Sequence, residues 1–344
     1  MATMIDYLHE YGTATFAEAP LSVVDAAILA QLAYCAFTPH TSGRLGSLTP
    51  QAQARLVQGT WQEAGNRQLL AAAAASPRYR NVQWLAPVAR LDADRQQEFS
   101  AVTFALAPQL YYVSYRGTRA SFVDWKEDFN MTFLAAIPSQ QAALAYFATV
   151  YTQHPGTYYL GGHSKGGTLA AYAYVNAEPA LQKNVLYVYN FDGPGLRQLH
   201  HDPKLLKLVP EASVVGMILE PGQDFGVVTS NARGWRQHDL LSWPIRARDF
   251  EYLPATSRRS QQLQALLLNW LDALDDTTKQ QALDAIYQVL SQTDAATFSE
   301  LTATPTQSAK AILAGLHTTS ADDHAAWRAV ADGLAKAVLA TLRH

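Results

Sequence analysis

The sequence is poor in cysteine and in charged residues. Among its 344 residues Cys35 is the only cysteine, so one chain can build neither a disulfide nor a zinc site of several thiolates. Lys and Arg number 26 against 29 Asp and Glu, and no basic cluster of the kind that binds nucleic acid stands out. We therefore expect no nucleic-acid partner. A single cysteine is typical of a reducing compartment, and we expect a cytoplasmic protein.

The chain has no Lys or Arg before Arg44, whereas a secretory signal has a basic start and an unbroken apolar core. The most apolar N-terminal stretch, residues 23–37, contains Asp25 and Gln31 at positions that suit the solvent-facing side of a helix. Ser22 and Asp25 have the spacing of a capping box, in which side chain and backbone cap each other in the first turn. We therefore predict a core-facing helix here, and no transmembrane segment.

Hydrophobic residues make up 49% of the chain, enough for a large buried core. Runs typical of strands alternate with runs typical of helices, which predicts an α/β fold with a mainly parallel sheet flanked by helices. The predicted strands are 99–104 and 110–115, which would form a hairpin, then 157–160, 185–191 and 213–219, with helices at 139–153 and 168 to about 178. From residue 257 only helical spacing remains. We predict a domain over 1–256 and an α-helical C-terminal extension over 257–344.

Residues 162–166 read G-H-S-K-G and match the G-x-S-x-G pattern of a nucleophile elbow. A predicted strand leads into Ser164 and a predicted helix follows, so the serine would lie on a strained turn that needs small residues at Gly162 and Gly166. The N–H groups of Lys165 and Gly166 would then lie at a helix N-terminus, where they can stabilise an oxyanion.

Two other interpretations of the same five residues have to be weighed. A phosphate-binding loop fits less well, because Lys165 is followed by glycine and not by Ser or Thr. A plain turn in which Ser164 only caps the helix stays open on this pattern alone. The decision depends on whether the chain also supplies an acid and a base.

A serine nucleophile works with a histidine base and an acid that orients the base, in the chain order serine, acid, histidine in α/β-hydrolases. Asp192 follows the first predicted strand after the elbow, and Glu220 and Asp224 follow the next. This fold usually places its acid two strands beyond the nucleophile, so we predict Asp224. Asp192 is the alternative acid, although its D-G-P-G sequence is also typical of a structural turn.

Four histidines come into question as the base. His238 alone follows the last predicted buried strand, in a loop ahead of an apolar run, and we predict it to be the base. His200 and His201 lie on a polar crossover, which is typical of solvated side chains. His163, beside the nucleophile, points the wrong way for a base and is expected to brace the elbow.

Longer strings resemble known families. Residues 115–118 (Y-R-G-T), the spacing on to Asp124 and Asp128, and the elbow G-H-S-x-G-G resemble the fungal-type class 3 lipases. A more extensive similarity, over roughly the first 245 residues, is to the bacterial Mbeg-like family of α/β-hydrolases. It is carried by the strings L-S-V-V-D at 21–25, D-W-K-E-D-F-N at 124–130, G-H-S-K-G-G at 162–167, N-F-D-G-P-G at 190–195 and Q-H at 237–238.

These resemblances imply the α/β-hydrolase fold and assign roles to individual residues. The lipase pattern implies that Thr118 provides the second oxyanion donor. It also implies that Asp224, in D-F-G-V-V at 224–228, is the acid and that His238 is the catalytic histidine. Lipases keep a lid over the site in the region that corresponds to residues 122–125.

The elbow departs from the lipases at Lys165, where they usually carry an aliphatic residue. A cation beside the nucleophile puts triglyceride specificity in doubt. It would favour an acyl or leaving group that bears a carboxylate or a phosphate, unless the Lys165 side chain extends to solvent.

These observations predict a serine hydrolase of esterase or lipase type that cleaves small-molecule carboxylic esters. Ser164, His238 and Asp224 form the predicted triad, the N–H groups of Lys165 and Thr118 form the predicted oxyanion hole, and no metal or cofactor is required. One alternative is a binding or scaffolding protein of the same fold with a vestigial triad. Another is an acyltransferase or thioesterase that uses the same triad.

Overall fold

The computed structural model describes residues 2–92, 95, 97–118, 127, 130–131, 134–196, 201–213, 215–219, 224–262, 264–265 and 277. The chain divides into two compact units, one of residues 1–91, 99–117 and 139–260 and the other of residues 92–98, 118–138 and 261–344. The helices and strands below belong to the first unit, apart from terminal residues of β2, β3 and α6. The predicted helical extension lies almost entirely outside the described residues, so the boundary at 256 stays a prediction.

A sheet built around parallel strands organises the first unit. Within the described residues it has nine strands in the order β1-β2-β3-β4-β5-β6-β7-β8-β11. Strands β4 to β8 are parallel, whereas β3 pairs antiparallel with β4 and β11 with β8. Their bounds are β1 (Gly43–Arg44), β2 (Gln83–Asp92), β3 (Gln97–Ala107), β4 (Leu110–Tyr115), β5 (Thr157–His163), β6 (Val185–Phe191), β7 (Leu205–Pro210), β8 (Gly226–Val228) and β11 (Tyr252–Leu253). The predicted hairpin is confirmed, with Thr103 opposite Val113.

The strand after β6 differs from the prediction. It is Leu205–Pro210, whereas the predicted strand 213–219 contains the short 3₁₀ helix η2 (Val215–Met217). Lys207 interrupts the apolar run of β7, yet its side chain is buried. Ser213 starts a turn, since its hydroxyl accepts a hydrogen bond from the N–H of Gly216 at 3.2 Å. The prediction was therefore wrong about which apolar run pairs with β6.

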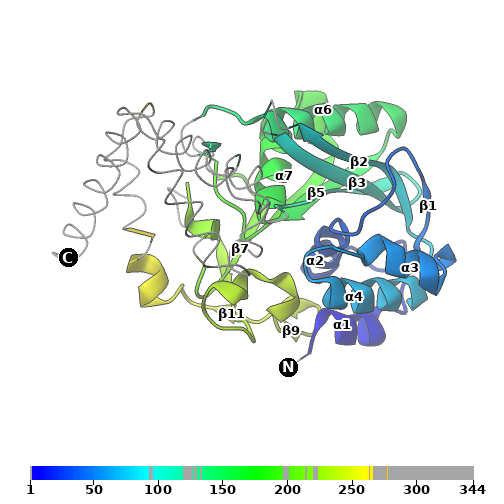
Figure 1. Ribbon diagram of the computed structural model, residues 1–344, viewed down its shortest axis with the longest axis horizontal. Helices are drawn as coiled ribbons and strands as arrows, with labels where there is room; N and C mark the ends of the chain where they lie inside the picture. Colours follow the sequence, from blue (N-terminus) through cyan, green and yellow to red (C-terminus); the bar gives the residue numbers. More distant parts are fainter. Residues whose placement is uncertain are drawn as a thin grey trace, which may run out of the picture. The chain divides into compact units, whose positions relative to one another are not determined.

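Helices cover both faces of the sheet (Figure 1). On one face α6 (Pro138–Gln153) and α7 (Lys165–Val175) pack against Val113, Leu160 and Val188 of β4 to β6. The other face packs against a group formed by α1 (Met4–Tyr11), α2 (Val23–Leu32), α3 (Pro50–Val57) and α4 (Glu63–Ala75). Burial of the strands on two sides explains their nearly continuous apolar sequences.

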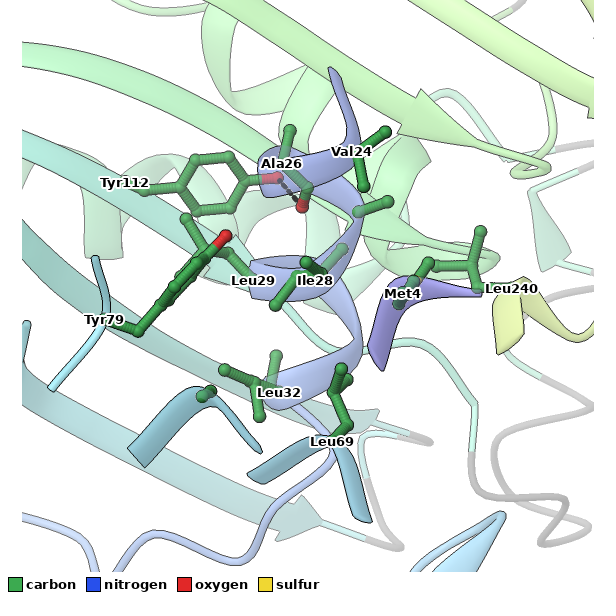
Figure 2. Close-up of a cluster of buried hydrophobic side chains, with 14 of the residues drawn as sticks. Met4, Val24, Ala26, Ile28, Leu29, Leu32, Leu69, Tyr79, Tyr112 and Leu240 are labelled. Carbon is green, nitrogen blue, oxygen red and sulfur yellow. Dashed lines mark hydrogen bonds between the residues drawn. The ribbon is translucent and has the colours of Figure 1, made fainter. Parts of the chain in front are cut away.

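Helix α2 runs through the middle of the larger apolar cluster (Figure 2). It begins at the predicted capping box of Ser22 and Asp25. Nearly all of its side chains are buried, and the carbonyl of Ala26 accepts a hydrogen bond from the hydroxyl of Tyr112 at 3.0 Å. The predicted solvent-facing side is absent: Asp25 and Gln31 are fully buried, because Asp25 pairs with Arg78 and Gln31 donates to Asn66 at 2.7 Å.

The remaining elements complete the path of the chain. They are η1 (Leu45–Ser47), α8 (Pro179–Lys183), η3 (Gly234–His238), η4 (Leu240–Ser242), and a small antiparallel pair of β9 (Ile245–Arg246) and β10 (Asp249–Phe250). Over the described ranges, no helix combines the length and the apolar character that a membrane span requires.

Candidate active site

Strand β5 delivers Ser164 into a sharp turn from which α7 starts at Lys165. Ser164 has φ 56° and ψ −135°, a region that side-chain-bearing residues rarely adopt. A Cβ atom on Gly162 would lie 2.4 Å from the carbonyl oxygen of Tyr115, and one on Gly166 would lie 2.2 Å from it. The two glycines of G-x-S-x-G are therefore required because the turn packs directly against the end of β4.

The carboxylate that meets His238 is that of Asp192. Nδ1 of His238 lies 2.7 Å from Oδ2 of Asp192, and the other oxygen, Oδ1, accepts a hydrogen bond from the hydroxyl of Ser213 at 2.5 Å. Asp192 is 1% exposed and has φ 51°, so the strand β6 ends in a left-handed residue that turns its side chain inward. Two donors therefore face one buried carboxylate, so both of its oxygens have a hydrogen-bond partner.

Asp224 takes a different place, and the predicted pairing of Asp224 with His238 is corrected to Asp192. The carboxylate of Asp224 lies 3.2 Å from Nδ1 of His201, and both side chains are mostly exposed, at 64% and 72%. Asp224 lines a cavity of about 320 Å³, whose walls also include Asn190 and Lys207. Asp224 was predicted because it follows residues 213–219, which were expected to form the strand after β6. That strand is β7, so the prediction started from the wrong segment. His200 and Glu220 lie outside the described residues.

Main-chain hydrogen bonds hold the segments of Ser164 and Asp192 to neighbouring strands, and a side-chain contact adds His238. The N–H of Ser164 donates to the carbonyl of Phe191 at 2.8 Å, and the N–H of Asp192 donates to the carbonyl of Leu208 at 2.8 Å. His238 is the last residue of η3, and the contact of its ring with Asp192 holds η3 at the same edge of the sheet. The structure thus places Ser164 and Asp192 at the carboxyl ends of neighbouring parallel strands, where ligands of open α/β sheets bind.

The His163 side chain contacts the segment of His238 and two aromatic residues. Its Nε2 lies 2.7 Å from the carbonyl oxygen of His238 and its Nδ1 lies 3.0 Å from the hydroxyl of Tyr34. The ring of Trp61 stacks on it at 5.6 Å with an interplanar angle of 12°. Burial and the neighbouring His238 both lower the pKa of His163 well below its usual value. Sequence reasoning missed Tyr34 and Trp61, because no local pattern links them to the elbow.

Gly117, which precedes the predicted oxyanion donor Thr118, lies against the elbow. Gly117 packs against the nucleophile, since a Cβ atom on this glycine would lie 3.0 Å from Cβ of Ser164. Lys165 begins α7, where the helix dipole favours negative charge. The roles of Thr118 and Lys165 as oxyanion donors stay predictions, and the predicted lid, residues 122–125, lies outside the described residues.

The side chain of Lys165 does not extend to solvent. It is 1% exposed, and it stands among the largest fully buried side chains of the described residues. The interpretation in which the Lys165 side chain extends to solvent is therefore wrong. The residue that follows the nucleophile therefore keeps its side chain inside the fold.

Comparison with known proteins places the chain in a family. A family model described as Mbeg1-like matches residues 73–288, which is more than half of the chain. The chain belongs to the Mbeg1-like family. It has the α/β-hydrolase fold, with a mostly parallel central sheet flanked by helices and a strand-to-helix turn at Ser164. A comparison with curated protein sequences gave no match.

Solved structures similar to this Mbeg1-like chain include three fungal lipases. They are Lip2 lipase from Yarrowia lipolytica (14% identity, 59% of this chain and 76% of that chain, TM-score 0.34), a Rhizomucor miehei lipase propeptide complex (16%, 44% and 58%, 0.31) and a structure described as fungal lipases (10%, 67% and 84%, 0.41). Identities and TM-scores of this size assign no roles to residues of this chain.

Other nucleophile and metal sites have little support in the part of the chain that the structure describes. Burial raises the pKa of the Cys35 thiol to about 12, so this residue is a thiol and a poor nucleophile at neutral pH. Among the described residues, no group of three or more His, Cys, Asp and Glu side chains could hold a metal ion.

Proposed function

We propose that this protein is a serine hydrolase that cleaves carboxylic esters through a triad of Ser164, His238 and Asp192. The observation that carries the proposal is the 2.7 Å contact between Nδ1 of His238 and the buried carboxylate of Asp192. It occurs beside a serine held in the strained backbone conformation of a nucleophile elbow. A histidine oriented by a buried carboxylate next to such a serine is the arrangement that acyl transfer requires.

The contact determines which nitrogen of His238 can act as a base. The carboxylate of Asp192 accepts, so Nδ1 of His238 carries the proton and Nε2 of the neutral ring keeps its lone pair. Nε2 takes the hydroxyl proton of Ser164 as Oγ attacks the ester carbonyl, and the imidazolium returns the proton to the departing alcohol. Water then attacks the acyl-enzyme by the same proton transfers, which releases the carboxylic acid and regenerates Ser164.

The negative charge that develops on the carbonyl oxygen needs donors. We assign this role to the N–H groups of Lys165, at the start of α7, and of Thr118, directly after Gly117. Lys165 is buried directly after Ser164 in the chain, and we infer that a cation at this position favours esters with an anionic acyl or leaving group. We also propose that the protein is cytoplasmic.

A fluorophosphonate probe tests the proposal, since it reacts only with activated serine nucleophiles. We expect the wild-type protein to be labelled at one residue and the Ser164→Ala variant to be unlabelled, with p-nitrophenyl acetate and butyrate hydrolysed only by the wild type. The variant should unfold close to the wild-type temperature, because only one hydroxyl is removed and the backbone of the turn is unchanged. A wild-type protein that is neither labelled nor active on these esters would overturn the proposal.

A further inference from the structure

His163 connects the segment of the proposed nucleophile to the segment of the proposed base. Its main chain immediately precedes Ser164, and its Nε2 lies 2.7 Å from the carbonyl oxygen of His238. The two imidazole rings are 4.5 Å apart between centroids. The contact therefore joins two residues that are 75 positions apart in the chain and must stay in register for proton transfer.

We propose that His163 is a positioning residue, which holds the main chain of His238 against the elbow by donating its Nε2–H to the His238 carbonyl. This inference rests on the proposed function, because it assigns the positioning of that base. It assigns no contact with substrate to His163.

The direction of the hydrogen bond follows from chemistry alone. The carbonyl oxygen of His238 can only accept, so Nε2 of His163 must carry the proton. In the neutral ring Nδ1 is then an acceptor, and the hydroxyl of Tyr34, 3.0 Å away, is the donor that completes the pair. Tyr34 thereby selects the tautomer of His163 that can hold His238.

The neutral state of His163 is secured by its surroundings. The ring is 1% exposed, with Trp61 stacked on it and Tyr34 at its Nδ1. A second positive charge so close to the His238 imidazolium would be strongly repelled, and this repulsion adds to the cost of burying a charge. His163 therefore keeps the same hydrogen bonds while His238 gains and loses its proton.

Among the described residues, the segment of His238 is also held by the contact of its ring with Asp192 and by hydrogen bonds of its neighbour Gln237. It belongs to η3, a 3₁₀ helix of five residues, whose short length provides few internal hydrogen bonds. Its neighbour Gln237 is held from the other side, since the indole N–H of Trp243 donates to its carbonyl and the N–H of Ala212 donates to its side chain, both at 2.8 Å. These bonds fix Gln237, whereas the His163 bond fixes the His238 carbonyl on the side of the elbow.

The test compares two substitutions that differ in one donor. In His163→Gln the amide Nε2 lies about as far along the side chain as the imidazole Nε2 and can donate to the same carbonyl, whereas His163→Leu fills similar space without a donor. We expect His163→Leu to lower kcat for p-nitrophenyl butyrate on the order of 10²-fold, with KM changed less than about threefold, because misplacement of a catalytic group acts on the chemical step. The kcat of His163→Gln should be at least about tenfold higher than that of His163→Leu.

A role in packing alone gives a different pattern. Wild-type kcat in His163→Leu, or equal losses in the Gln and Leu variants, would overturn the inference while leaving the proposed function intact. An inactive and unlabelled wild-type protein would instead overturn the proposed function, and the inference with it.

Tyr34→Phe gives a second measurement if His163→Leu does not fold. It removes only the hydroxyl that selects the tautomer, so kcat should fall about 10-fold, the equivalent of one ordinary hydrogen bond, with KM unchanged. Wild-type kcat in this variant would contradict the proposed selection of the tautomer and overturn the inference.

Discussion

Replacement of Asp192 by asparagine is expected to lower kcat by about 10⁴-fold, with little change in KM or in stability. The hydroxyl of Ser213 receives a hydrogen bond from the N–H of Gly216 and gives its own proton to Oδ1 of residue 192. In Asp192→Asn this donor keeps the amide oxygen in place, so the amide NH₂ faces Nδ1 of His238. His238 must then accept at Nδ1 and carry its proton at Nε2, where it can no longer take the proton of Ser164.

Asp224→Asn is the matched control for Asp192→Asn. The same change of carboxylate to amide affects only an exposed pair with His201, and kcat should stay within about twofold of the wild type. The measurement is the steady-state hydrolysis of p-nitrophenyl butyrate by both variants, with the rate of fluorophosphonate labelling as a second measure. A large loss in Asp224→Asn together with an active Asp192→Asn would restore Asp224 as the acid.

Removal of the Arg78 side chain is expected to lower the free energy of unfolding by about 3–5 kcal/mol. Arg78 and Asp25 form a bidentate pair, with distances of 2.9 Å from Nε to Oδ1 and 2.7 Å from Nη2 to Oδ2, and their side chains are 1% and 0% exposed. Asp25 also accepts from the hydroxyl of Tyr79 at 2.7 Å. Arg78→Ala leaves this carboxylate buried without its counter-charge, which is the costly way to break a buried ion pair.

The guanidinium of Arg78 also ties down the loop between α1 and α2. It donates to four carbonyl oxygens of that loop, those of Ala14, Thr15, Ala19 and Pro20. Burial alone would lower the pKa of Arg78, but the hydrogen bond and the charge of Asp25 outweigh it, and the pKa is raised. Arg78→Lys should therefore lose much of the stability too, because an ammonium cannot reproduce the planar fork of donors.

A surface pair provides the control for Arg78→Ala. Arg67 and Glu63 lie 2.6 Å apart, closer than Arg78 and Asp25, but their side chains are 56% and 39% exposed. We expect Arg67→Ala to cost less than about 0.5 kcal/mol, because solvent screens the pair. Urea denaturation measures both losses as shifts of the midpoint at constant slope. Similar losses in the two variants would show that burial of the Arg78 pair has no special effect.

The parts of the fold that follow from local rules could be predicted from the sequence. The capping box at Ser22, the hairpin of β3 and β4, and the strand β6 depend on side-chain period, turn residues and cap spacing within a few positions. The strand β7 escaped prediction because Lys207 breaks its apolar run. Whether a lysine is buried depends on its tertiary surroundings, which no short sequence pattern shows.

The same division applies to the candidate site. The elbow at Ser164 is a local feature: G-x-S-x-G between a strand and a helix restricts the backbone, so the sequence alone determined its strained turn. Only the tertiary structure decided that Asp192, and not Asp224, meets His238. That choice depends on the register of β7 beside β6 and on the Ser213 turn, and such long-range pairing leaves no periodic pattern near either aspartate.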